Sequence, residues 1–207
     1  MMLPLALSVI NEHAEVIPEV KKWLHIPDNL KILQSLAEGN CLPCPETTKL
    51  LTHKDAAGKT ILEDETLPDK IYKELLALAL NMVNKNDLLV PEVKREIAKV
   101  ENLTILQAKA EEKCLTGPTI SNLLTHKNDE GQTILEDETL AENTYKVLFK
   151  LALSALKDEH DLVPIVKGEI GKPKNWEAKK RLEKENHLPN NVMKELGLEI
   201  PKLPFEI

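Results

Sequence analysis

Two histidines occupy the same place in a repeated stretch of the chain. His53 and His126 each follow a threonine and precede a lysine, and the carboxylates of Asp55 and Glu63 lie close to His53 in sequence. A histidine oriented by a carboxylate can act as a general base. No serine or cysteine nucleophile recurs beside both histidines, and a histidine near a helix end more often bonds to the last carbonyls. An enzyme with a histidine and acidic site at the interface between the two copies is therefore the alternative interpretation.

Three cysteines raise a second kind of chemistry. Cys41 and Cys44 form a C-x-x-C pair, which is typical of redox or zinc sites. Cys114 repeats Cys41, but Gly117 stands where Cys44 would recur, and no second cysteine pair exists. We therefore expect structural cysteines, with no metal and no cofactor. An odd cysteine count without a disulfide framework also fits a reducing compartment.

The histidines belong to an internal duplication with an offset of 73 residues. The segment 50–67 reads LLTHKDAAGKTILEDETL, and 123–140 reads LLTHKNDEGQTILEDETL. Without a gap, 29–97 aligns with 102–170, and 37 of 69 positions are identical. The flanks continue the pattern more faintly, as expected where terminal repeats act as caps. We expect repeat units at 29–101 and 102–174, with partial repeats or caps at 1–28 and 175–207.

Each copy carries one loop between a short helix and a long helix. Asp55 and Gly58, like Asn128 and Gly131, predict a tight turn, because Asp or Asn bonds back to the backbone and glycine supplies a positive φ. The residues 60–62 fit a short extended arm, which would make a small finger or hairpin. The acidic triplets that follow precede helix N-termini, where negative charge is favoured.

This loop is the candidate binding surface, since loops on a rigid scaffold carry binding more often than cores do. A purely structural role, in which both copies need the same turn to connect two helices, remains open. The oxygen spacing of an EF-hand is absent, which argues against a calcium or magnesium site. The candidate binding residues, none of them catalytic, are His53, Lys54, Asp55, Glu63, Asp64, Glu65, His126, Lys127, Asn128, Glu136, Asp137 and Glu138.

The string D-x-x-G-x-T-x-L at 55–62 resembles the turn that opens an ankyrin repeat. The resemblance covers these eight residues and their counterparts at 128–135, and it implies similar turn chemistry. The duplicated helical scaffold, poor in aromatic residues, is also similar to secreted effectors of intracellular bacteria. That likeness implies export into a host cell without a cleavable signal peptide.

Around the loop, the pattern predicts about four helices per unit and few strands. Capping boxes at 66–69 and 139–142 would begin a long helix that ends near Asn84 and Lys157. That helix is apolar nearly all round, so we expect it to be central. The remaining helices are expected at 47–52 and 120–125, at 92–100 after the break at Val90-Pro91, and at 103–113 with a counterpart at 30–38. The expected fold class is all-α: a tandem helical repeat, either a short α-solenoid or two packed helical units, with a finger loop in each.

The composition of the chain indicates which classes of partner are favoured. A net charge of −7 opposes nucleic-acid binding, and 3% aromatic residues leave few stacking platforms. No apolar run approaches the roughly 20 residues of a membrane span, and the first ten residues lack a basic leader, so we expect a cytoplasmic protein or one exported without a cleavable signal. The sequence favours a protein–protein interaction module of the helical-repeat type without catalytic activity, either effector-like or part of a longer repeat protein. It leaves the oligomeric state open.

Overall fold

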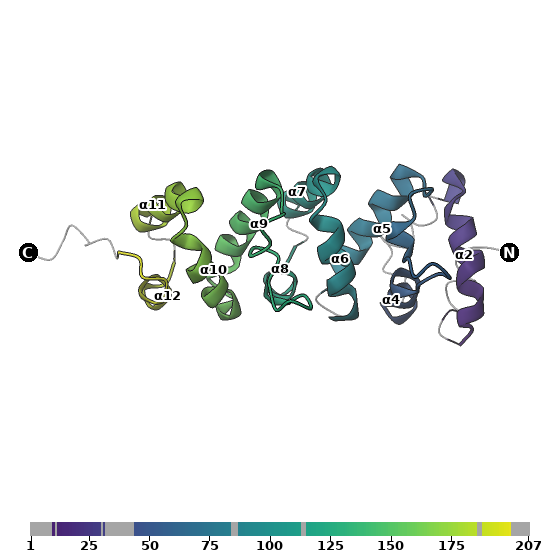
Figure 1. Ribbon diagram of the computed structural model, residues 1–207, viewed down its shortest axis with the longest axis horizontal. Helices are drawn as coiled ribbons and strands as arrows, with labels where there is room; N and C mark the ends of the chain where they lie inside the picture. Colours follow the sequence, from purple (N-terminus) through teal and green to yellow (C-terminus); the bar gives the residue numbers. More distant parts are fainter. Residues whose placement is uncertain are drawn as a thin grey trace, which may run out of the picture. The chain divides into compact units, whose positions relative to one another are not determined.

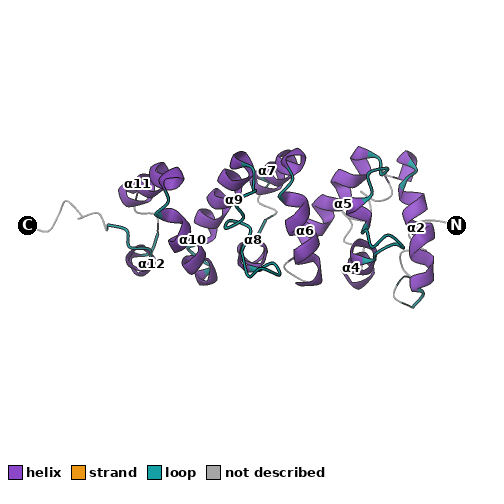
Figure 2. Cartoon of the chain, in the orientation of Figure 1, coloured by secondary structure: helices purple, strands orange, loops and turns teal. Residues whose placement is uncertain are grey.

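The computed structural model describes Ile10, 12–29, Lys31, 44–83, 87–112, 115–185 and 188–199. Within these ranges every regular element is a helix and no residue lies in a strand (Figure 2). The all-α prediction is confirmed for this part of the chain. The helix expected at 30–38, apart from Lys31, and the cysteines Cys41 and Cys114 lie outside the described residues.

The chain divides into two compact units, Met1–Leu115 and Thr116–Ile207, which are described separately. The compact units divide after Leu115, whereas the 73-residue offset placed a repeat boundary after position 101. Because a sequence period fixes a length and not a starting point, the repeat boundaries remain a prediction.

The first unit contains five described α-helices joined by short 3₁₀ turns (Figure 1). The α-helices are α2 (Ile17–Leu24), α4 (Cys44–Thr52), α5 (Asp69–Met82), α6 (Val90–Ile97) and α7 (Leu103–Glu111). The 3₁₀ turns are η1 (Ala14–Val16), η2 (Pro27–Asn29), η3 (Ile61–Glu63), η5 (Asp87–Leu89) and η6 (Val100–Asn102).

The second unit repeats the order short helix, long helix, 3₁₀ turn and short helix. Its α-helices are α8 (Gly117–Thr125), α9 (Glu142–Ala155), α10 (Val163–Ile170), α11 (Trp176–Glu185) and α12 (Asn190–Glu195). Its 3₁₀ turns are η7 (His160–Leu162) and η8 (Pro173–Asn175). Helices α8, α9 and α10 thus start 73 residues after α4, α5 and α6.

The long helix is the centre of the first unit, as its apolar pattern predicted. α5 packs against α4, α6 and α7. Ile71, Leu75, Leu76, Ala79 and Leu80 are fully buried on it. Burial of a leucine or isoleucine side chain contributes about 1.5–3 kcal/mol, so this helix anchors the unit. In the second unit α9 packs in the same way against α8 and α10.

Prolines begin helices in this fold and do not interrupt them. α6 starts at Val90 with Pro91 in its first turn, and α10 starts at Val163 with Pro164 in its first turn. A proline there is tolerated because its missing N–H has no intrahelical acceptor anyway. The helix expected at 92–100 therefore lies at Val90–Ile97, and Val100 already belongs to the turn η6.

Two local expectations were wrong. Thr66 and Thr139 do not cap the long helices, because α5 and α9 begin after Pro68 and Ala141 without a side-chain cap. Thr60-Ile61-Leu62 is not an extended arm, since Ile61–Glu63 forms the 3₁₀ turn η3. The finger is a tight turn without strands. In the described ranges, no helix is long and apolar enough to cross a membrane.

Candidate functional site

In the repeated loop of the first unit, the Asp55 side chain accepts hydrogen bonds from two backbone N–H groups. The Oδ1 atom of Asp55 accepts hydrogen bonds from the N–H groups of Ala57, at 2.8 Å, and Lys59, at 2.9 Å. The N–H of Asp55 donates to the carbonyl of Lys59, which closes the turn at 2.9 Å. Gly58 supplies the positive φ of 77° that this closure needs. The predicted Asp–Gly turn is confirmed.

The second copy forms the same turn with an amide in place of the carboxylate. Asn128 Oδ1 accepts from the N–H of Glu130 at 3.1 Å and of Gln132 at 2.8 Å, and Gly131 has a φ of 78°. The geometry therefore needs an oxygen at this position but not a charge. The Asp55 carboxylate is exposed, and its hydrogen bond from Lys59 is the main reason why its pKa is lowered.

The first two residues of each acidic triplet accept hydrogen bonds that stabilise the loop. Glu63 accepts from the N–H of Thr60 at 2.8 Å, and Glu136 accepts from the N–H of Thr133 at 2.7 Å. This is the returning arm of a capping box, placed six residues before the predicted box and closing the 3₁₀ turn in the first copy. Burial of Glu63 opposes ionisation, but the Thr60 bond and the Arg95 charge outweigh it and lower its pKa.

The second member explains why the predicted capping box does not form. Asp64 Oδ1 accepts from both the N–H and the hydroxyl of Thr66, at 3.0 and 2.6 Å. Asp137 binds Thr139 in the same way, at 2.8 and 2.6 Å. Each threonine is thus engaged before the helix starts. The third members, Glu65 and Glu138, are exposed. The triplets therefore stabilise the loop through hydrogen bonds, in addition to placing negative charge before a helix N-terminus.

The histidines lie at the ends of the short helices. The His53 carbonyl accepts from Lys21 Nζ of α2 at 3.0 Å, and His126 is the C-cap residue of α8. The Nδ1 atom of His53 is buried and has no hydrogen-bond partner among the described residues. Lys54 and Lys127 are exposed. Their charges help to lower the pKa of Glu63 and Glu136, but hydrogen bonding and burial have larger effects on these pKa values.

The expected orienting acids of His53 are engaged elsewhere. Asp55 closes its own turn, and Glu63 bonds to Thr60 and pairs with Arg95. His53 and His126 also belong to different compact units. A catalytic site shared by the two histidines therefore remains a prediction. Cys44 begins α4, but its side chain lies outside the description. The described residues include no group of three His, Cys, Asp or Glu side chains arranged to hold a metal.

A buried polar network is the feature that the sequence interpretation missed. In the second unit, the hydroxyl of Tyr145 donates to Glu169 Oε2 at 2.9 Å. Asn175 Nδ2 donates to the Tyr145 hydroxyl at 2.6 Å and to the Glu169 carbonyl at 2.8 Å. Lys172 Nζ binds Glu169 Oε1 at 2.6 Å, which neutralises a carboxylate that is almost fully buried. We call these four residues the tyrosine network of the second unit.

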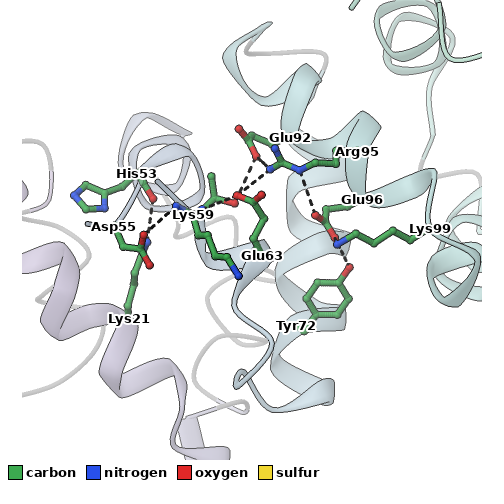
Figure 3. Close-up of polar contacts among 11 residues, drawn as sticks. Lys21, His53, Asp55, Lys59, Glu63, Tyr72, Glu92, Arg95, Glu96 and Lys99 are labelled. Atoms are coloured by element: carbon green, nitrogen blue, oxygen red, sulfur yellow. Dashed lines mark hydrogen bonds and ion pairs between the residues drawn. The ribbon is translucent and has the colours of Figure 1, made fainter. Parts of the chain in front are cut away.

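The first unit contains the same tyrosine network 73 residues earlier, formed by Tyr72, Glu96, Lys99 and Asn102. Tyr72 donates to Glu96 Oε2 at 2.8 Å, and Lys99 Nζ binds the same oxygen at 2.7 Å (Figure 3). Asn102 donates to the Tyr72 hydroxyl and, at 2.8 Å, to the Glu96 carbonyl. In each unit the tyrosine hydroxyl thus joins the long helix to the glutamate of the following short helix. Burial is the main reason why the pKa of both tyrosines is raised, and the neighbouring glutamates add to it.

Arg95 distinguishes the first unit from the second. Its guanidinium pairs with Glu63 at 3.2 Å, with Glu92, and with Glu96 at 3.7 Å, as Figure 3 shows. The equivalent positions of Arg95 and Glu92 in the second copy are Gly168 and Ile165. This cluster ties the acidic triplet of the loop to α6 in the first unit only.

An open pocket of about 470 Å³ lies where the loop, α5 and α6 of the first unit meet. The acidic triplet lines it together with Tyr72, three cations and two further acids. The lining residues are Lys59, Leu62, Glu63, Asp64, Glu65, Leu67, Asp69, Tyr72, Arg95, Lys99 and Glu101. Of the candidate binding residues, the pocket therefore includes Glu63, Asp64 and Glu65 but not His53, Lys54 or Asp55.

The charge of this pocket is unevenly compensated. Five carboxylates and three cations line it. Arg95 and Lys99 are paired with Glu63, Glu92 and Glu96, and Asp69 pairs with Lys73 at 2.7 Å. Glu65, Glu101 and Lys59 have no ion-pair partner within the described part of the chain, so two carboxylates and one ammonium remain uncompensated. The pocket is thus predisposed to hold a positively charged group.

Comparison of the chain with models of protein families, with curated proteins and with solved structures gives no match.

Proposed function

We propose that the chain is a protein–protein interaction module of the tandem helical-repeat type, which uses its loops to bind a basic segment of another protein. The observation that carries the proposal is the pocket of the first unit, where the acidic triplet of a repeated loop borders an open cavity with uncompensated carboxylates. The two loops are held by the same hydrogen bonds, so each presents an exposed glutamate and an exposed lysine in a fixed way.

Rigid presentation favours binding because little conformational entropy is lost when the partner docks. Complementary charge mainly raises the association rate and selects among partners. The net charge of −7 also favours a basic protein segment over a nucleic acid as the partner. A role as an exported effector or as part of a longer repeat protein is compatible with this activity.

Affinity capture tests the proposal with substitutions that leave the loop fold intact. We expect Glu65→Lys combined with Glu138→Lys to abolish capture of the partner, because these glutamates are exposed and make no hydrogen bond that supports the turn. Lys54→Ala with Lys127→Ala should not weaken capture, because it removes positive charges that repel a basic partner segment.

The matched control is Glu111→Lys combined with Glu195→Lys, which changes the net charge equally. These exposed glutamates end α7 and α12, where a cation is favoured by the helix dipole. Both double variants should keep the circular dichroism of the parent chain. Equal capture by the loop variant and the control would refute the proposal.

A further inference from the structure

The two tyrosine networks differ in what covers the tyrosine ring. In the second unit the Lys174 ammonium lies over the ring of Tyr145, with Nζ 3.4 Å from the ring centroid. The ring of Phe149 stacks beside it, with centroids 5.8 Å apart. Tyr145 is consequently only 3% exposed. A cation at this distance is attracted by the negative face of the ring.

In the first unit the residue equivalent to Lys174 is Glu101. The tyrosine is still fixed in place, because Tyr72 makes the same bonds to Glu96 and Asn102 as Tyr145 makes to Glu169 and Asn175. Tyr72 is only half-buried and lines the open pocket. Within the described residues, no cation lies over its ring.

Lys99 does not take the place of the missing ammonium. It corresponds to Lys172, and both bind the buried glutamate behind the tyrosine hydroxyl. The second unit has Lys174 in addition to Lys172, whereas the first has an acid at the corresponding place. Two exchanges accompany the greater exposure of Tyr72: Glu101 stands in place of Lys174, and Leu76 stands in place of Phe149. The first exchange also places a negative charge near the ring.

We infer that the pocket of the first unit binds a lysine side chain of the partner protein, with the ammonium over the Tyr72 ring and its charge compensated by Glu101 and Glu65. The inference rests on the proposed interaction function and names the group that is recognised. A lysine is the expected guest because the second unit places its own lysine on the equivalent ring. In the second unit Lys174 already occupies the face of the Tyr145 ring, so one chain binds one lysine at a tyrosine ring.

The probe is an acetylated and amidated tetralysine peptide, titrated into the ¹⁵N-labelled full chain and followed by heteronuclear NMR. We expect shifts at the amides of Leu67, Tyr72 and Glu101, and none at Tyr145. The same peptide with acetylated lysine side chains should not bind, because it carries no ammonium. Glu101→Lys restores the residue of the second unit and should weaken tetralysine binding at least tenfold.

The reciprocal variant should create a second binding site for tetralysine. Lys174→Glu should uncover Tyr145 and produce a second set of shifts at its amide. Tyr72→Leu should bind tetralysine at least fivefold more weakly than the parent, since cation–ring attraction in a partly desolvated site corresponds to about 1 kcal/mol or more. Retained amide dispersion confirms the fold of each variant.

Unchanged tetralysine binding by Glu101→Lys, or shifts remote from Tyr72, would overturn the lysine site. The two proposals can fail separately. Loss of partner capture in the Glu65 and Glu138 variant, with tetralysine binding indifferent to Glu101, leaves the interaction function and removes the lysine site. Tetralysine binding at Tyr72 with equal capture by the loop variant and its control leaves the lysine site and removes the function.

Discussion

Replacing Asn175 by alanine should destabilise the second unit measurably. Asn175 is 4% exposed, and its amide donates to the Tyr145 hydroxyl and to the Glu169 carbonyl. Each buried hydrogen bond contributes about 0.5–1.5 kcal/mol, and the Glu169 carbonyl would lose this donor within the core. We therefore expect a loss of about 1–3 kcal/mol in the free energy of unfolding. With a urea dependence of about 1–2 kcal/mol per molar, the midpoint should fall by about 0.5–3 M.

The chain offers a separate fluorescent reporter for each unit. Its two tryptophans are Trp23, in the first unit, and Trp176, in the second. In a Trp23→Phe background, the fluorescence of Trp176 follows urea unfolding of the second unit alone. The matched control is Asn143→Ala, since Asn143 is exposed on α9 and should change stability by no more than about 0.5 kcal/mol.

The equivalent substitution tests whether the two networks have the same role. Asn102→Ala, followed by Trp23 in a Trp176→Phe background, should lower the midpoint of the first unit by a similar amount, because Asn102 makes the same two bonds. Midpoints of Asn175→Ala and Asn143→Ala that coincide would refute the reasoning that this network stabilises the fold.

Two further outcomes follow from the loop. Gly58→Ala should destabilise by about 1–2 kcal/mol in thermal or urea unfolding, because a φ of 77° strains an L-residue while the space for a Cβ is open; Gly58→Asn should cost less, and equal stability of both variants would contradict this. Glu63→Gln with Glu136→Gln should flatten the acid sensitivity of the chain. Both acids have pKa values lowered from the ordinary 4.5, so their contribution is complete above that pH and is lost as the pH falls through the lower folded values. Urea midpoints at pH 7 and pH 3 should therefore differ more for the parent than for the double variant, and equal differences would exclude the mechanism.

The sequence predicts best what neighbouring residues determine. The turn at Asp55 and Gly58 follows from local chemistry, since one carboxylate accepts hydrogen bonds from two N–H groups within the next four residues. The long helices end at Met82 and Ala155, within two residues of the expected ends. Their ends could be predicted this closely because a long apolar pattern is a strong helix signal. Competition between two local motifs was harder to predict. Thr66 could cap the helix or bond to Asp64, and the closer partner prevails.

The site depends on contacts that local patterns do not specify. Tyr72, Glu96 and Asn102 span 30 residues, and only their packed helices bring them together. Their recurrence at the 73-residue offset marks a shared role but does not reveal that the tyrosine hydroxyl reaches a glutamate. The pocket likewise depends on where Arg95 and the loop meet. Recurrent polar residues at buried positions were the available signal for the network.

The differences between the copies separate the scaffold from the specificity of the proposed site. The residues that fold the loop and the tyrosine network recur, because every unit needs them to bury its polar groups. Positions 95 and 101 change in charge between the copies, to Gly168 and Lys174. Arg95 braces the loop and Glu101 faces the pocket, so neither is required by the shared scaffold. A duplicated scaffold that keeps its buried network while reversing the charge beside one tyrosine has the properties expected of a module in which only the first copy carries the proposed lysine site.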